Sequence, residues 1–287
     1  GGYQLCPNQR LPHISINADG YRGRPFLQTE RVLLLGDSVT FGVGASSDER
    51  CFARFLEEAL GVPVADASLR AYRVFQHFDK LPSLLARFPH LTHVLLWCGY
   101  MEFLYWVLTG GCVEGAFSFE WKYHPGAIRL QTSSRLRQFL FYRTKRSTDQ
   151  LMSWLQGSPI APTRVKGSLE DLVDFTAVHI RAIRDLCESR KIHFHVLLQP
   201  FVRTRPVTHD LQALVDHYDV KTAQQCGQPW YELAPRFVQD LQSAMWRCGN
   251  IPWIDCQGLG GEQEFLDQVH LTESALQRLA QTLARDR

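Results

Sequence analysis

Several features that would assign a chain to a large functional class are missing from this sequence. Its 31 basic and 29 acidic residues leave a formal net charge of +2, too small to indicate a nucleic-acid partner by charge alone. No apolar run approaches the roughly 20 residues that a membrane-spanning helix needs. Internal repeats and low-complexity tracts are also absent. These absences favour a globular protein that does not act on nucleic acid.

Cysteine pairs and targeting signals are likewise missing. The eight cysteines form no CxxC pair and no cluster, which favours reduced, partly buried thiols. Cys248 and Cys256 are close enough in sequence to form a bridge in an oxidising compartment. No signal peptide is recognisable, which favours a cytoplasmic location, whereas a signal or anchor upstream of this sequence would place the protein outside the cytoplasm.

The common metal and nucleotide motifs are not found. The chain has no HExxH, GxxxxGK[ST], GxGxxG or GxSxG. His193 and His195 alternate on a predicted strand and so face the same side, which is how a metal site begins. No third ligand is spaced nearby, so we expect two packed histidines at a sheet edge, with no metal and no organic cofactor.

What the sequence does contain is a regular alternation of strands and helices. Five apolar runs without two-residue alternation are typical of parallel strands covered on both faces: Val32–Leu35, Val62–Ala65, His93–Cys98, Ile192–Leu198 and Ile251–Ile254. Helical patterns lie between and after them: Asp48–Leu60, Arg70–Phe88, Leu169–Ser189, Pro235–Cys248 and Thr272–Arg287. The order predicts an α/β fold, a three-layer α/β/α sandwich with a central five-stranded parallel sheet, as a single domain over residues 1–287.

One segment interrupts this alternation. Residues 103–166 are rich in aromatic side chains and leave the third predicted strand at its carboxyl end. We expect an insertion that forms a lid or pocket wall, or else a subsidiary core packed on the main domain. Within it, the basic and aromatic segment 133–147 either lies on an anionic membrane surface or forms a solvated helix.

The stretch "LLLGDSVTFG" ends the first predicted strand on a glycine, an acid and a serine. Sites in parallel α/β sheets lie at the carboxyl ends of the strands, which is where this order places Ser38. A serine hydroxyl is a poor nucleophile at neutral pH and needs a base, usually a histidine that a carboxylate orients. "FLDQVHLTESALQRLA" contains such a pair, Asp267 and His270, just before the last predicted helix.

Together, GDS after the first strand and DxxH before the last helix resemble the SGNH (GDSL-type) hydrolases. The stretch "SINADGYRGRPF" is similar to a segment that precedes GDS in many members. The resemblance covers nearly the whole chain outside the insertion and implies the α/β/α, flavodoxin-like SGNH fold. It also implies Ser38 as nucleophile, His270 as general base and then general acid, and Asp267 as the orienting carboxylate. Asp37 is expected to help bind substrate.

The middle motifs depart from the family. In "VADASLRAYR", Ser68 stands where the family has a glycine whose N–H binds the oxyanion. In "WCGYMEF", Gly99 is kept, but Met101 and Glu102 replace an asparagine and an aspartate. A methionine thioether donates no hydrogen bond, and loss of one oxyanion donor costs about 3 kcal/mol. The oxyanion donors implied by the resemblance are the N–H groups of Ser38, Ser68 and Gly99. The residues expected to contact substrate beside them are Tyr100, Met101 and Glu102.

Three explanations of the missing asparagine stay open. The donor comes from elsewhere, for example from Tyr100, Tyr123 or His124; the enzyme is slow or specialised for acyl transfer; or the chain is a binding protein that kept the cleft. The sequence therefore predicts a serine esterase or acyltransferase acting on an oxygen ester through an acyl-enzyme, with the binding protein as the alternative. Expected substrates are an O-acetylated sugar, a lipid ester or an acylated natural product.

Overall fold

The computed structural model describes residues 3–115, 165–202, 209–259, 264–267 and 269–285. The chain divides into two compact units, one made of Gly1–Ala116 with Lys166–Arg287 and the other of Phe117–Val165. All the elements below belong to the first unit. Tyr123, His124 and the basic segment 133–147 lie outside the described residues.

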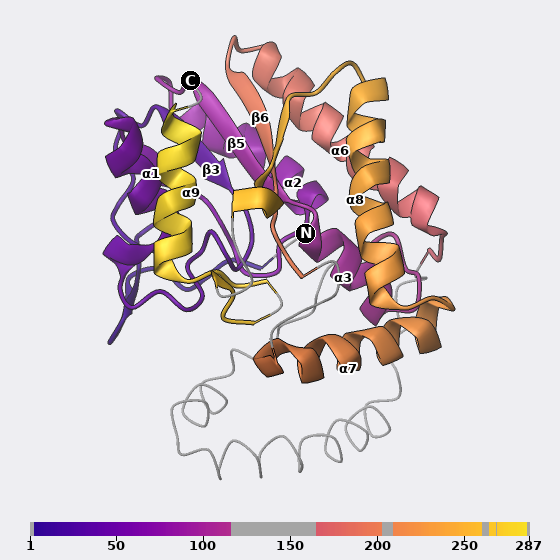
Figure 1. Ribbon diagram of the computed structural model, residues 1–287. Coiled ribbons are helices and arrows are strands. Elements are labelled where there is room, and N and C mark those ends of the chain that lie inside the picture. The colour runs from indigo at the N-terminus through magenta and orange to yellow at the C-terminus, as the bar shows by residue number, and fades with distance from the viewer. Residues whose placement is uncertain (1–2, 116–164, 203–208, 260–263, 268, 286–287) are drawn as a thin grey trace, which may run out of the picture. The chain divides into compact units, whose positions relative to one another are not determined.

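A five-stranded parallel sheet forms the centre of the first unit (Figure 1). In spatial order its strands are β4 (Val64–Asp66), β3 (Val32–Leu35), β5 (His93–Cys98), β6 (His193–Leu198) and β7 (Trp253–Asp255). All four residues of β3 are completely buried, because helices cover both faces of the sheet. This burial explains the continuous apolar runs, and the predicted sheet is confirmed.

Helices cover the two faces in separate groups. On one face α1 (Phe52–Leu60) packs on α9 (Glu273–Arg285), and on the other α6 (Leu169–Glu188) packs on both α2 (Val74–Arg87) and α8 (Trp230–Arg247). The chain moves from β3 outward to β4 and then back through β5, β6 and β7. Since crossovers between parallel strands are right-handed, this reversal sends the connecting helices to opposite faces. The predicted three-layer sandwich is confirmed.

Several elements were not predicted. They are α3 (Tyr100–Leu108), α7 (His209–Cys226), the hairpin of β1 (Gln9–Leu11) with β2 (Ile14–Ile16), and the short 3₁₀ helix η2 (Cys256–Leu259). A second 3₁₀ helix, η1 (Asp48–Arg50), lies at the start of the segment Asp48–Leu60 that was expected to be helical. In α3 every residue from Tyr100 to Val107 is buried, so no polar face reveals the helical period.

The expected insertion begins later than residue 103. Phe103 belongs to α3, and its ring centroid lies 4.8 Å from that of Trp230 and 5.4 Å from that of Phe237, both on α8. These contacts place the start of the aromatic-rich segment in the core of the first unit. The second unit begins at Phe117.

The eight cysteines are free thiols, including Cys248 and Cys256. Five of them are buried, among them Cys98 at the end of β5. Within the described residues, the helices are all too short or too polar to span a membrane.

Candidate active site

Ser38 lies in a tight turn directly after β3, at the carboxyl edge of the sheet. The Val43 N–H donates to the Ser38 carbonyl (2.9 Å) and closes the turn. Gly36 is required at the turn's entry because a Cβ there would clash with the Thr40 hydroxyl. β4 and β5 lie on opposite sides of β3, so the turn sits where the strand order reverses, the place where ligands bind in open α/β sheets.

Arg22 stabilises this turn through hydrogen bonds to its carbonyl groups. Its side chain is almost fully buried, and one guanidinium nitrogen donates to the carbonyls of Phe41 (3.1 Å) and Gly42 (2.6 Å). Its Nε pairs with Asp48 Oδ1 at 2.7 Å. Arg22, which belongs to the "SINADGYRGRPF" segment, therefore positions the loop that follows Ser38.

Asp267 and His270 lie on one short loop before α9. Asp267 Oδ1 accepts hydrogen bonds from the N–H groups of Val269 (2.9 Å) and His270 (2.8 Å). The Leu266 N–H donates to the His270 carbonyl at 2.7 Å and closes the loop's base. One carboxylate thus both shapes the loop and stands beside the imidazole, which is the physical basis of the DxxH spacing.

The loop brings the imidazole to the serine. His270 Nδ1 lies 2.7 Å from Asp267 Oδ2, and His270 Nε2 lies 2.8 Å from Ser38 Oγ. Burial alone would raise the pKa of Asp267, but the hydrogen bonds and charge of His270 outweigh it and hold this pKa below its usual value. An ionised Asp267 accepts the Nδ1 proton, so Nε2 presents a lone pair to the Ser38 hydroxyl.

Glu273, the first residue of α9, ties the two loops together. Its carboxylate accepts from the Ser46 N–H (2.6 Å) and from Arg50 Nε (2.9 Å). A Cβ on Gly44 would clash with the side chain of Leu266, so the loops also touch directly. These contacts hold the loop that carries Asp267 and His270 (the acid–base loop) against the loop that follows Ser38 (the serine loop). The two loops are more than 200 residues apart in sequence.

Asp37 lies beneath the turn rather than on an open surface. It is 2% exposed, and its Oδ1 accepts from the Val39 N–H at 2.9 Å. Burial raises the pKa of Asp37 to about 7, because a desolvated carboxylate loses its hydration. The residue expected to bind substrate is thus an interior carboxyl group.

Two of the three expected oxyanion donors are already engaged. The Ser68 N–H donates to Asp66 Oδ1 at 3.0 Å, and the Gly99 N–H donates to Glu102 Oε2 at 3.1 Å. The Ser38 N–H has no acceptor within the described residues. Of the three expected donors, the Ser38 N–H is thus the one without a partner among the described residues.

Ala71 carries a further backbone N–H without an acceptor among the described residues, which the sequence did not indicate. After β4 the chain continues alongside β3, with the Leu69 N–H donating to the Gly36 carbonyl at 3.0 Å. The chain then turns, with the Tyr72 N–H donating to the Leu69 carbonyl at 3.1 Å, and Ala71 lies within this turn. Its φ is +55°, and its N–H has no acceptor in the described part of the chain. Alanine rarely adopts this left-handed conformation, so the sequence offered no signal of it.

The residues after Gly99 are mostly interior. Tyr100 is 2% exposed, packs on the Trp230 ring at 6.2 Å and hydrogen-bonds to the Tyr218 hydroxyl. Met101 is 5% exposed in the first turn of α3. Glu102 is buried, and its second carboxylate oxygen accepts from the Val74 N–H at 2.8 Å, which joins α3 to the start of α2.

The histidines at the other end of the sheet pack on one another. The His93 ring is tilted against His193 and stacked on His195, with centroid distances of 5.1 and 6.4 Å. Across the residues that the structure describes, no three or more His, Cys, Asp or Glu side chains gather as metal ligands would.

Comparisons with known proteins bear on the fold. No protein-family model matches the chain, and no curated protein matches it. Among solved structures, a candidate GDSL-like lipase from Parabacteroides merdae matches with a TM-score of 0.50 and 12% identity, over 90% of this chain and 94% of that one. The chain has the SGNH-hydrolase fold.

Two further solved structures are similar at lower scores. The aryl esterase of M. smegmatis matches with a TM-score of 0.49 and 13% identity, over 90% of this chain and 97% of that one. A GDSL-like lipase from Bacteroides thetaiotaomicron matches with a TM-score of 0.45 and 11% identity, over 92% of each chain.

Proposed function

We propose that this protein is a serine esterase of the SGNH type, which hydrolyses or transfers an acyl group from an oxygen ester. The observation that carries the proposal is the continuous hydrogen-bonded chain from Asp267 through His270 to Ser38. The fold supports the proposal, because it places these three hydrogen-bonded residues where the strand order of the sheet reverses.

The reaction follows from the proton positions. His270 Nε2 takes the proton of Ser38 as Oγ attacks the ester carbonyl, and the tetrahedral intermediate forms. The imidazolium then donates that proton to the leaving alkoxide, which departs as an alcohol and leaves an acyl-enzyme. Water, or an acceptor alcohol, repeats the two steps and releases the acid or a new ester. Asp267 keeps Nδ1 protonated throughout.

The oxyanion is assigned to the N–H groups of Ser38 and Ala71. Both lie at the carboxyl edge of the sheet, and both lack an acceptor among the described residues. Backbone donors fixed before the reaction stabilise a developing negative charge without reorganisation. The start of α3 at the same edge adds the positive end of a helix dipole.

A binding protein that uses the same cleft remains the second candidate. The observation that favours it is the engagement of the Ser68 and Gly99 N–H groups, together with a thioether at Met101. Such a protein would bind esters without turning them over.

An ester panel separates the two functions. Short-chain aryl esters, long-chain lipid esters and sugar acetates are incubated with wild type, Ser38→Ala and Ser47→Ala. Ser47 is a matched control because it lies on the same loop and its side chain forms no cap hydrogen bond. We expect turnover by wild type and Ser47→Ala only, and the preferred ester names the substrate class. Equal rates for wild type and Ser38→Ala would refute the esterase.

A further inference from the structure

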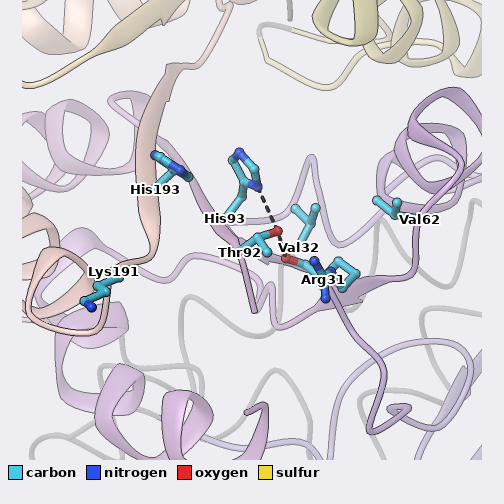
Figure 2. Close-up of a pocket in the computed structure, with 7 residues that line it drawn as sticks. All are labelled: Arg31, Val32, Val62, Thr92, His93, Lys191 and His193. Atoms are coloured by element: carbon cyan, nitrogen blue, oxygen red, sulfur yellow. Dashed lines mark hydrogen bonds between the residues drawn. The ribbon is translucent and has the colours of Figure 1, made fainter. Parts of the chain in front are cut away.

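An open cavity of about 380 Å³ lies at the amino ends of β3, β5 and β6, at the edge of the sheet opposite Ser38. Figure 2 shows the residues that line it: Arg31, Val32, Val62, Thr92, His93, Lys191 and His193. This volume falls within the range of small-molecule sites. The cavity shares no residue with the proposed catalytic machinery.

The lining is basic and contains no acid. Arg31 and Lys191 are exposed, and neither forms an ion pair within the residues that the structure covers. By contrast, Arg22, Arg24 and Arg50 each pair with a carboxylate. Two cations that face one cavity without counter-charges leave a positive potential there, and an anion would relieve it.

Hydrogen bonds determine which ring nitrogen of His93 carries the proton. The Thr92 hydroxyl donates its single proton to the Arg31 carbonyl at 3.0 Å, so its oxygen accepts from His93 Nδ1 at 2.9 Å (Figure 2). Nδ1 therefore carries the imidazole proton of His93. The His193 ring lies beside the His93 ring, tilted by 31°, with a centroid distance of 5.1 Å.

Lys191 occupies an unusual backbone position. It follows α6 with φ of +61°, a left-handed conformation that glycine or asparagine normally fills after a helix. A lysine there is less favourable than glycine or asparagine, because its Cβ crowds the following carbonyl oxygen. The turn therefore holds an ammonium group at the cavity at the expense of backbone strain.

We propose that this cavity binds a phosphate group, either as free phosphate or on a small organic molecule. The two positive charges match the double negative charge of a phosphate group. Arg31 would contribute a planar guanidinium with several N–H donors, and Lys191 a compact ammonium group. Nearby backbone N–H groups are already paired, since those of Arg31 and Val32 donate to Pro63 and that of His193 to Thr92. Side chains must therefore hold the anion, and the half-buried Val62 offers an apolar wall to an organic substituent.

Calorimetric titration at constant ionic strength tests this site with inorganic phosphate and glycerol phosphate as probes. The variant is Arg31→Gln with Lys191→Asn, because asparagine removes the charge and tolerates the left-handed backbone. The matched control is Arg10→Gln with Arg236→Gln, two exposed arginines outside the cavity. Ser38→Ala serves as a second control that alters only the opposite edge of the sheet.

We expect saturable binding by wild type and by both controls, and affinity at least about tenfold weaker in the cavity variant. Tighter binding of glycerol phosphate would show that the valine wall contacts an organic part, and tighter binding of phosphate would show that the free ion is the ligand. The absence of saturable binding to wild type, or equal affinity in the cavity variant, would overturn the proposal.

Discussion

At the scale of single residues, the proposed ester chemistry depends on the atoms around Ser38 Oγ. Residue types and spacing predicted the partners, because a DxxH carboxylate closes its own loop and orients the ring in one step. The oxyanion side was less predictable. Whether an N–H is free depends on nearby acceptors, and Asp66 and Glu102 already engage two of the expected donors.

Met101→Asn tests how complete the oxyanion site is. An asparagine in the first turn of α3 would add a side-chain N–H donor where the thioether provides none. Since one donor is worth about a hundredfold or more in rate, we expect kcat on a short aryl ester to rise at least about tenfold. Unchanged or lower kcat in a folded variant would show that the backbone donors already suffice.

Asp37→Asn tests the buried carboxyl group through stability. The pKa of Asp37 is raised from 3.8 to about 7, so between about pH 4 and pH 7 the folded protein keeps a proton that the unfolded chain releases. Stability of the wild type should therefore fall as pH rises through this window. Asparagine does not titrate, so the variant should gain relative stability with rising pH, on the order of 4 kcal/mol at most.

Urea denaturation of both proteins at several pH values measures this difference. A variant-minus-wild-type free energy of unfolding that stays constant from pH 4 to pH 7 would contradict the raised pKa. The same experiment on Asp174→Asn, an exposed carboxylate on α6, provides the control.

At the scale of elements, a strand or helix could be predicted where its sequence reveals which residues are buried. β3 and β5 begin and end where the apolar runs do, because buried strands are bounded by the first polar or glycine residue. α3 was missed because its aromatic residues are buried all round. Its residues from Phe103 onward were assigned to the insertion, although the contact of Phe103 with α8 makes α3 part of the core.

Glu273→Ala tests the link between the serine loop and the acid–base loop. Losing the contacts to Ser46 and Arg50 should let the His270 loop shift and lower kcat by about tenfold, since small misplacements of catalytic groups are costly. Stability should change by under about 1 kcal/mol because both side chains of the pair remain partly in contact with solvent, which screens the interaction.

Steady-state kinetics and urea denaturation measure the two effects separately. Glu188→Ala is the control, an exposed carboxylate at the end of α6 with its own arginine partner. Equal losses of kcat in both variants, or a kcat loss that matches a large loss of stability, would contradict a positioning role for Glu273.

At the scale of the whole molecule, one parallel sheet separates two sites. Right-handed crossovers gather the residues that follow the strands at one edge, where Ser38 and His270 meet, and those that precede them at the other, where Arg31 and Lys191 face the phosphate cavity. The sequence predicted the first edge because motifs follow strands. It did not predict the second, because a cavity depends on how three strand starts come together.

The most direct test of the central claim is covalent labelling of Ser38. A fluorophosphonate reacts with an activated serine hydroxyl, with loss of fluoride, and intact-mass and peptide mass spectrometry locate the adduct. We expect one adduct, on Ser38, in wild type, with none in Ser38→Ala and much slower labelling in folded His270→Ala. Absence of labelling in native wild-type protein, or labelling that persists at full rate without His270, would contradict the account.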